Sequence, residues 1–375
     1  MTGMFTYVES ESSAKIKVIG VGGAGGNAIN NMILSNLHGV KFISANTDAQ
    51  SLDVAQAEMR IQLGVEITEG LGAGANPQVG RDAALENAEM IKDALSDSHM
   101  VFITAGFGGG TGTGAAPVIA RLCKEMGILT VAVVTRPFSF EGRKRAKQAE
   151  DGIIELKKAA DTVITIPNDR LRGLASKNAK MVDMFRKADE ILLHSVKGIT
   201  DLIMMPGLVN LDFADVKTTM SRAGMAIMGI GSSSGENRAL EAAERAISHP
   251  LLEDINERIY NEVGDDAEII WGAVIDDSVG DEMSVTVIAT GIGEKEKEKE
   301  KEAVLKVMDP TYGGKVRDIT PADLARSSEL DAPTFIRRRQ AVNERPASEL
   351  YREYKGIVID NDDLDVPTFL RRKAD

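Results

Sequence analysis

Short apolar runs rich in β-branched residues alternate with longer stretches of helical periodicity in the first half of this chain. Strands and helices that alternate on this spacing form βαβ units, and such units build a parallel sheet with helices on both faces. The pattern therefore predicts an α/β domain. The predicted strands are 15–19, 41–45, 100–105, 128–135 and 162–166, and the clearest helices are 78–96 and 115–126.

A long helical period comes next along the chain. Apolar residues recur every three or four positions through 178–205 for about seven turns, until Pro206 and Gly207 interrupt the pattern. We expect one long helix between two sheet regions. Strand-like segments at 225–230, 268–275 and 284–290, with an alanine-rich helix at 237–248, then predict a second, smaller α/β domain.

The sequence changes character after residue 293. Alternating Glu and Lys put like charges at i,i+4, which favours a solvated linker over a helix. Beyond the linker, LDAPTFIRRR at 330–339 returns as LDVPTFLRRK at 364–373, and each copy joins an apolar pair to three cations. Such peptides dock into apolar grooves with acidic rims. The predicted divisions are an extension (1–14), a first domain (15–177), a central helix (178–206), a smaller domain (207–293), a linker (294–329) and a tail with two peptides (330–375).

Composition excludes several classes of function. The 375 residues carry 44 Lys and Arg against 57 Asp and Glu, a formal net charge of −13. Residues 1–291 hold 27 basic and 39 acidic side chains, whereas 292–375 hold 17 and 18. An acidic body disfavours binding to nucleic acid or anionic lipid. A single cysteine, Cys123, excludes a disulfide framework and a cysteine-based zinc cluster.

Targeting and metal signals are also missing from the sequence. No basic segment followed by an apolar stretch opens the chain, and no apolar run is long enough to cross a bilayer, so we expect a cytoplasmic protein. The four histidines show no metal-ligand spacing, so we expect no metal site built from protein ligands.

Three glycine-rich segments carry the strongest chemical signal. The first segment, GVGGAGGN at 20–27, fits G-x-G-x-x-G between a strand and a helix. The second, GGGTGTG at 108–114, lies between another predicted strand and helix, and the third, GLGAGANP at 70–77, is expected to follow a strand. Glycines let backbone N–H groups approach a phosphate at a helix N-terminus, and two threonine hydroxyls add further donors. No Lys-Ser/Thr comes after the glycines, so this is not a P-loop. Packing alone explains three such segments poorly, and we expect a polyphosphate site at one sheet edge.

Two alternatives stay open at this point. The first glycine segment alone also suits an NAD-dependent oxidoreductase of the Rossmann type, which needs an acid about twenty residues further on. Asp48 lies 28 residues after Gly20 and fits that requirement poorly. A nucleotide-binding scaffold without catalysis is the other alternative.

The motifs together resemble the FtsZ family, the bacterial tubulin-like cell-division GTPases. Besides the three glycine segments they are ANTDAQ at 45–50, RPFSFEG at 136–142, TIPND at 165–169 and NLDFAD at 210–215, and the resemblance runs from about residue 16 to residue 293. It implies a tubulin-like fold, binding of GTP or GDP with Mg²⁺, GTP hydrolysis, and head-to-tail polymerisation into the filament ring at the mid-cell division site.

The resemblance also assigns site residues. It implies contacts of Glu141 and Arg145 with the ribose side, and of Asn168, Phe185 and Asp189 with guanine. A carboxylate and an aromatic side chain suit guanine, because the carboxylate accepts hydrogen bonds from the N–H groups of the base and the aromatic ring stacks on it. The remaining nucleotide positions that it implies are Gly22, Gly23, Ala24, Gly25, Gly26, Asn27, Ala73, Gly74, Gly109, Gly110, Thr111, Gly112, Thr113 and Gly114.

The acids of NLDFAD have two interpretations. Asp212 with Asp215 three residues later, just before a helix, has the pattern of an N-cap and a first-turn acid, and the residues alone favour that interpretation. The resemblance implies instead that Asn210, Asp212 and Asp215 of one subunit meet the nucleotide of the next and polarise the attacking water. Hydrolysis would then require assembly, because no single chain holds a complete site.

Two features depart from the family's pattern. The resemblance implies one C-terminal peptide that binds division-ring proteins and membrane-tethering adaptors, but this chain has two, at Leu330–Arg339 and Leu364–Lys373, which implies avidity or two partners. After 248–254 the chain also lacks a glycine-flanked apolar strand that the family has there. We therefore expect a smaller domain with one strand fewer and an exposed sheet edge.

Overall fold

A computed structural model describes most of the first 291 residues. Asn210, the linker and both tail peptides lie outside the described residues. So does most of the region in which a strand is expected to be missing. The described ranges are 14–172, 180–205, 207–209, 212–221, 223–251, 273–274 and 280–291.

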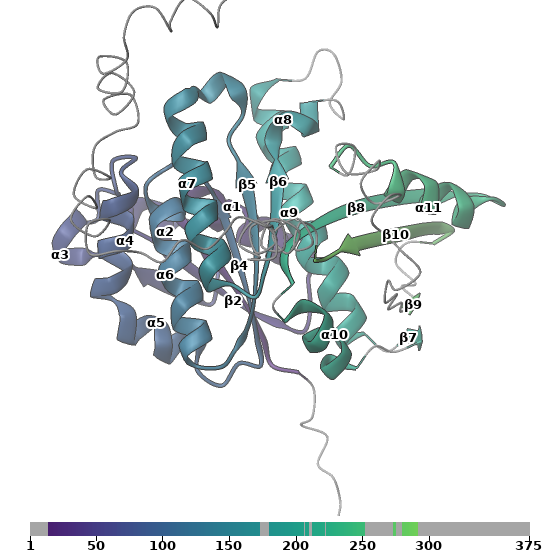
Figure 1. Ribbon diagram of the computed structural model, residues 1–375, viewed down its shortest axis with the longest axis horizontal. Coiled ribbons are helices and arrows are strands. Elements are labelled where there is room, and N and C mark those ends of the chain that lie inside the picture. Colours follow the sequence, from purple (N-terminus) through teal and green to yellow (C-terminus); the bar gives the residue numbers. More distant parts are fainter. Residues whose placement is uncertain are drawn as a thin grey trace, which may run out of the picture. The chain divides into compact units, whose positions relative to one another are not determined.

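One eight-stranded sheet organises the fold (Figure 1). Its order is β10-β8-β6-β5-β4-β1-β2-β3, and every neighbouring pair is parallel except β8 with β10. The five predicted strands of the first half are confirmed. The strands are β1 (Ile16–Val21), β2 (Val40–Asn46), β3 (Met59–Gln62), β4 (Met100–Gly106), β5 (Leu129–Arg136), β6 (Thr162–Pro167), β8 (Gly224–Ser234) and β10 (Glu282–Ala289), beside a separate antiparallel pair, β7 (Gly207–Val209) and β9 (Ala273–Val274).

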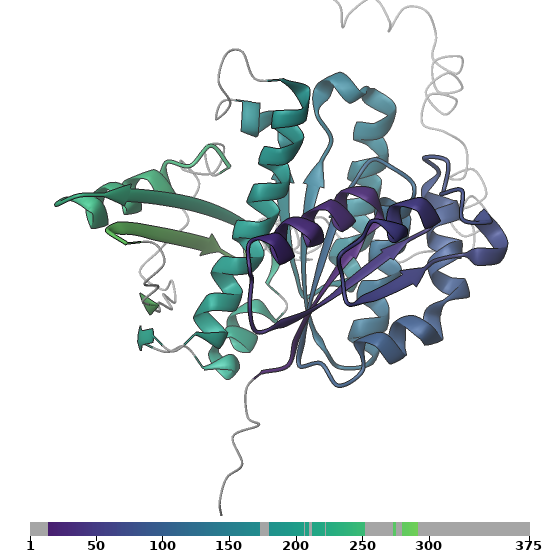
Figure 2. The same ribbon diagram turned by 180° about the vertical axis from the view of Figure 1, so that it is seen from behind.

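Helices cover both faces of the sheet, as the alternating pattern predicts (Figures 1 and 2). One face carries α1 (Gly22–Leu34), α9 (Met181–Met204) and α10 (Phe213–Met220), and the other carries α4 (Pro77–Glu86), α5 (Ala88–Leu95), α6 (Thr111–Glu125) and α7 (Arg143–Ala159). The shorter helices are α2 (Ala49–Asp53), α3 (Val65–Thr68), η1 (Ser139–Glu141), α8 (Asn168–Leu171) and α11 (Arg238–Ile247).

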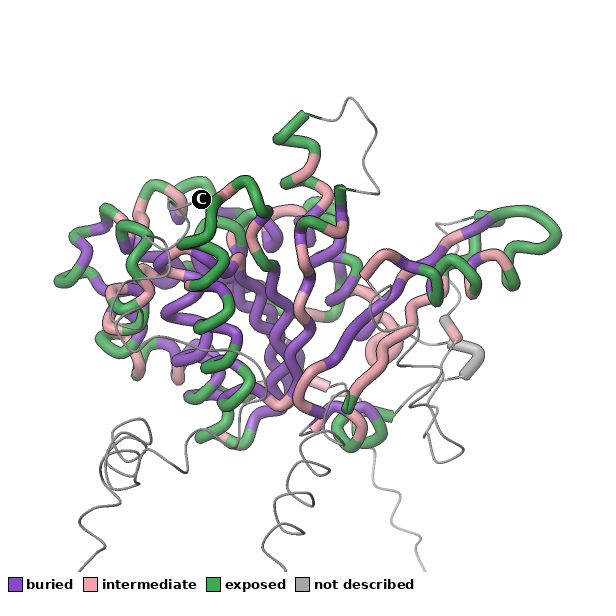
Figure 3. Tube along the Cα trace, turned by 45° about the horizontal axis from the view of Figure 1, so that its top comes forward, coloured by how far each residue is buried: buried purple, intermediate pink, exposed green. Residues whose placement is uncertain are grey.

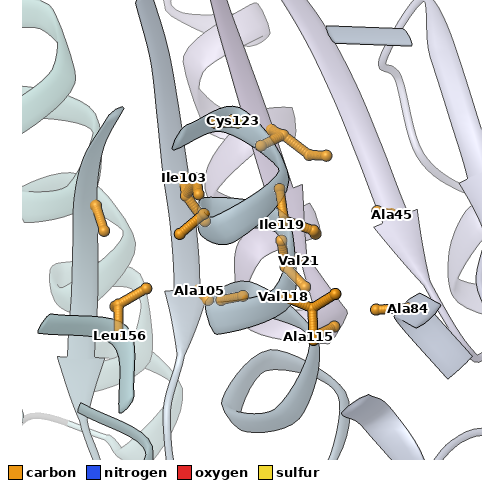
Figure 4. Packing of buried hydrophobic residues seen from close by; sticks show 14 of the residues in the cluster. Val21, Ala45, Ala84, Ile103, Ala105, Ala115, Val118, Ile119, Cys123 and Leu156 are labelled. Carbon is orange, nitrogen blue, oxygen red and sulfur yellow. The ribbon is translucent and has the colours of Figure 1, made fainter. Parts of the chain in front are cut away.

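Alternation along the central strands divides the core into two layers. Val18 and Phe102 pack in the layer under α1 and α9, and their neighbours Ile19 and Ile103 pack in the layer under α6. Central strands are buried almost end to end, which is typical of parallel strands covered on both faces (Figure 3). Figure 4 shows how small and branched residues of α6, Ala115 to Cys123, fill the space above β1 and β4.

Several predicted helix boundaries are wrong. The helix expected at 78–96 is two helices that meet at Asn87, whose side-chain oxygen accepts a hydrogen bond from the Gly64 N–H at 2.7 Å. The glycine segments near Gly22 and Thr111 are helical from those residues onward, so they form first turns rather than loops. The segment at 70–77 comes after α3, not after a strand.

α9 confirms the long helix, but its apolar stripe is only partly buried. Burial begins at Ala188, whereas Met181, Val182 and Phe185 in the first turns are exposed. The N-terminal part of α9 therefore presents apolar side chains at the sheet edge where β5 and β6 end.

The expected smaller domain shares a sheet with the first domain. Gly224 to Ala226 of β8 pair with β6, and Ile227 to Ser234 of the same strand pair with β10. α11 packs closely on β8, because a Cβ on Gly231 would meet the Ala242 carbonyl oxygen. The strand expected at 268–275 is described only at Ala273–Val274. The domain boundaries remain predictions.

Candidate functional site

The carboxyl ends of the parallel strands gather most of the predicted site residues at one edge of the sheet. β1 leads into α1, β4 leads through 107–110 into α6, β5 leads into the Phe138 segment, and β6 leads into α8 at Asn168. In open α/β sheets, ligands bind outside this edge. The fold therefore brings together the starts of α1 and α8, Gly22 and Asn168, which are 146 residues apart in the sequence.

Two helix N-termini meet at the centre of this edge. α1 and α6 start from the neighbouring strands β1 and β4, and a Cβ on Gly22 would lie 3.1 Å from the Gly112 nitrogen. Neither helix has a side-chain cap or an acid in its first turn. The first N–H groups of an α-helix lack intrahelical partners and form its positive end. The pair therefore offers uncompensated donors to an anion.

The glycines at this edge fall into two groups. A Cβ on Gly23, Gly74 or Gly109 would meet no atom within 4 Å, so these three leave open space for a ligand. Gly25, Gly110, Gly112 and Gly114 are packing glycines instead, so the expectation that packing does not explain the segments is wrong for these four. A Cβ on Gly25 would lie 2.5 Å from the Thr104 oxygen, and one on Gly110 would lie 2.7 Å from the Ala73 Cβ. A Cβ on Gly112 would lie 2.5 Å from the Gly106 oxygen, and one on Gly114 would lie against the Pro77 oxygen.

The threonine hydroxyls are also engaged within the protein. Thr113 is buried, and its Oγ1 accepts a hydrogen bond from the Gly108 N–H at 2.9 Å. The Thr111 and Thr47 hydroxyls are hydrogen-bonded to each other at 2.6 Å, which joins the end of β2 to the start of α6. Thr113 therefore shapes the segment through the acceptor side of its hydroxyl, and the interpretation of this hydroxyl as a phosphate donor stays a prediction. Thr47 lies within ANTDAQ, but the motif by itself does not predict this role.

An unpartnered amide oxygen and a largely buried carboxyl lie in the part of the edge assigned to guanine. Asn168 is buried at the start of α8, and its Oδ1 has no hydrogen-bond partner among the described residues. Burial raises the pKa of the Asp189 carboxyl to about 7. Asp189 lies one turn after the exposed ring of Phe185 on α9, which packs against α8. Two such acceptors beside an aromatic ring fit a base that carries N–H groups.

The two residues assigned to the ribose side bind each other. Arg145 Nη1 lies 2.7 Å from Glu141 Oε2, and Glu141 Oε1 accepts from the Phe138 N–H at 2.9 Å. Arg145 is thus not an uncompensated cation. Asp169, which the sequence does not single out as a site residue, accepts from the Ser139 N–H and ties this segment to α8.

Asp212 and Asp215 lie at the opposite edge of the sheet. The Phe213 ring between them lies 6.0 Å from the ring of His99, which precedes β4, so α10 begins at the amino end of the strands. Figure 1 shows α8 and α10 at opposite ends of the central strands. The seven residues of β4 span about 20 Å. The acids of one chain therefore cannot reach its own glycine edge.

The capping interpretation of Asp212 and Asp215 is confirmed in position, because Asp215 lies in the first turn of α10, but no capping hydrogen bond accompanies it. Asp212 occupies the N-cap position of α10, but its side chain makes no capping hydrogen bond. Asp212 and Asp215 are both exposed. Their carboxylates are available to another molecule.

Other candidate chemistry is weak. No group of three or more His, Cys, Asp or Glu among the described residues could hold a metal ion. Burial raises the pKa of the Cys123 thiol to about 12, so this side chain is an unreactive part of the core. No helix in the described ranges is long and apolar enough to cross a membrane.

Comparison with known families agrees with this geometry. The family model "Tubulin/FtsZ family, GTPase domain" matches residues 15–176, and "FtsZ family, C-terminal domain" matches 224–256 and 253–293. The second match is split at the position where a strand is expected to be missing.

Curated relatives and solved structures show the same likeness. The chain is 48% identical to the cell division protein FtsZ of Pseudomonas aeruginosa, over 92% of this chain and 95% of the relative, and 47% identical to that of Pseudomonas putida, over the same shares. An empty FtsZ dimer from M. jannaschii superposes with a TM-score of 0.71 at 43% identity, over 76% of this chain and 90% of that one. CetZ2 from Haloferax volcanii, at 19% identity and a TM-score of 0.62, shares the fold over 78% of this chain and 99% of its own. None of these comparisons favours an NAD-dependent enzyme.

Proposed function

This chain belongs to the FtsZ family of tubulin-like GTPases, and from that membership we propose that the carboxyl edge of its sheet is the GTP site of a filament-forming cell-division protein. The protein is a GTPase of cell division that binds GTP and GDP and polymerises. Separate groups of its residues bind the phosphates, recognise the base, complete hydrolysis and recruit partners.

The meeting of α1 and α6 is the observation that supports the site. Two uncapped helix starts in contact at Gly22 and Gly112 present N–H donors to a polyphosphate, and Gly23 and Gly109 leave the space that it would fill. The chain needs this arrangement because its net charge of −13 does not attract a triphosphate. Backbone donors therefore carry most of the binding to the phosphates.

Asn168, Phe185 and Asp189 recognise the base. The buried Asn168 oxygen and the Asp189 carboxylate accept hydrogen bonds from guanine, and the exposed Phe185 ring stacks on it. Adenine presents fewer donors toward such acceptors, so the site selects GTP over ATP. Glu141 and Arg145 act as a pair beside the ribose.

Hydrolysis is completed by the next subunit. Asp212 and Asp215 orient and polarise water toward the γ-phosphate bound to a neighbouring chain, with Asn210 from the same segment. Mg²⁺ offsets the phosphate charge when bound, and phosphate oxygens are ligands of the kind that it prefers. The opposite placement of acids and glycines makes assembly a condition of turnover.

Recruitment is assigned to the tail. Leu330–Arg339 and Leu364–Lys373 bind division-ring proteins and membrane-tethering adaptors, which place the filaments at mid-cell. The duplicated peptide gives each subunit two attachment points, so binding of a dimeric adaptor gains avidity.

One experiment tests the activity as a whole. The purified full chain is mixed with GTP, GDP or ATP and Mg²⁺, while light scattering and phosphate release are recorded. GTP-dependent scattering with phosphate release supports the proposal. Nucleotide binding without either signal would identify a scaffold, and equal responses to ATP and GTP would contradict the guanine site.

A further inference from the structure

We propose that Phe138 is a positioning residue that sets the plane of the Phe185 ring for stacking on the guanine base. This inference rests on the proposed function, because it takes Phe185 to be the stacking residue. It adds a residue that does not touch the nucleotide and acts through another side chain.

The two rings meet edge to face. Their centroids are 5.4 Å apart with an interplanar angle of 88°, which is a favourable aromatic geometry. Phe138 is 1% exposed, whereas Phe185 is 41% exposed. A fixed, buried ring therefore contacts one that is open to solvent.

Phe138 is held from three sides. Phe140 stacks on it at 5.0 Å and 10°, and its own N–H donates to Glu141 Oε1. The next residue, Ser139, donates its N–H to both oxygens of Asp169 at 3.0 and 3.1 Å. These contacts anchor the segment after β5 to α8, so the Phe138 ring has little freedom to move.

Phe185 has much less support of its own. It lies in the first turns of α9, where Met181 and Val182 are exposed and burial begins only at Ala188. Phe138 is the aromatic ring that contacts it among the described residues. The perpendicular contact restricts the Phe185 ring before the base arrives, and this pre-organisation raises affinity by lowering the ordering cost of binding.

The test removes the ring edge and keeps an apolar side chain of similar reach. For Phe138→Leu in the full chain, we expect the Kd for GDP to rise about 2- to 12-fold, the range that one edge-to-face contact gives. GDP keeps the measurement separate from GTP turnover. Inorganic triphosphate, measured by competition, should bind wild type and variant equally, because it has no base to stack.

A double-mutant cycle separates positioning from general structure. If Phe138 acts through Phe185, Phe138→Leu should not weaken GDP binding further in a Phe185→Leu background. Phe140→Leu is the matched control, since Phe140 stacks on Phe138 but makes no ring contact with Phe185 among the described residues, and it should change the Kd less than Phe138→Leu. Additive effects in the cycle, or an equal loss of triphosphate binding, would overturn the proposal.

Failure of the proposed function would look different. If wild type itself fails to bind GDP, the guanine site is wrong, and if only the cycle is additive, the positioning role is wrong. Thermal unfolding without nucleotide checks that each variant folds. Should Phe138→Leu not fold, Phe138→Met fills the buried space with a more flexible side chain and is subjected to the same cycle.

Discussion

Gly22 at the start of α1 and Gly112 in the first turn of α6 lie so close that a Cβ on Gly22 would be 3.1 Å from the Gly112 nitrogen. Gly22 also has φ of +73°, a left-handed conformation that glycine adopts without strain. This contact places two positive helix ends side by side at the carboxyl edge of the sheet.

Substitution by alanine should affect the packing glycines and the glycines that face open space differently. Gly112→Ala puts a methyl group 2.5 Å from the Gly106 oxygen, and we expect about 1–3 kcal/mol of lost stability. Gly109→Ala faces open space, so stability should change little while nucleotide affinity falls, since the methyl group occupies ligand space. Urea unfolding without nucleotide and GDP titration measure the two effects. Equal loss of stability in both variants would refute the distinction.

Asp189 should make guanine binding depend on pH. Burial raises the pKa of its carboxyl to about 7 without nucleotide, and only the carboxylate accepts from the base. GDP affinity should therefore fall about tenfold per pH unit below 7. Asp189→Asn is the control, because the phosphates of GDP still titrate in this variant, whereas residue 189 no longer has a carboxyl group that titrates. A constant ratio of wild-type to variant affinity between pH 5 and 8 would exclude this role.

The same carboxyl should affect the stability of the nucleotide-free protein. Its folded pKa is raised above the ordinary value of 3.8, so its contribution to stability is complete below about pH 4 and is lost as the pH rises through 7. Urea unfolding of wild type and Asp189→Asn across this interval measures the effect. Wild type should lose stability relative to the variant, and the opposite slope would contradict the burial of the carboxyl.

Asp212 should separate binding from turnover. Asp212→Ala should bind GDP normally, because the residue lies at the far edge of its own chain, yet lose GTP hydrolysis by roughly 100-fold or more. Glu244→Ala, an exposed acid on α11, is the matched control and should hydrolyse GTP normally. If Asp212→Ala lost binding and stability together, the acid would be a structural cap and the proposal of a shared site would fail.

The second tail peptide should be dispensable for chemistry. Deletion of 364–375 should leave GTPase activity unchanged, because the peptide lies beyond a long charged linker, and should weaken capture on adaptor-coated vesicles by reducing avidity. Deletion from 330 onward should abolish capture. A large fall in GTPase activity after the shorter deletion would show that the tail contributes to the folded body.

Local patterns predict the strands well, and glycine-rich segments are harder to interpret. The spacing of apolar residues and the runs of β-branched residues locate the central strands, because both signals depend only on neighbours in the sequence. The glycines are typical of loops, although α1 and α6 begin inside them. Glycine has low helix propensity, and only packing of the two helix starts against β1, β4 and α4 overrides it at Gly25, Gly112 and Gly114.

The sequence by itself determined the class of fold, the acidic charge that disfavours binding to nucleic acid, and motifs specific enough to identify the family. Each of these depends on residue types and short spacings. Only the tertiary structure decided which glycines face a ligand, that Arg145 is paired with Glu141, and that Phe138 supports Phe185. It also decided that Asp212 lies about one strand length from the glycine edge. These are relations between residues far apart in the chain, which packing of the sheet and its helices creates.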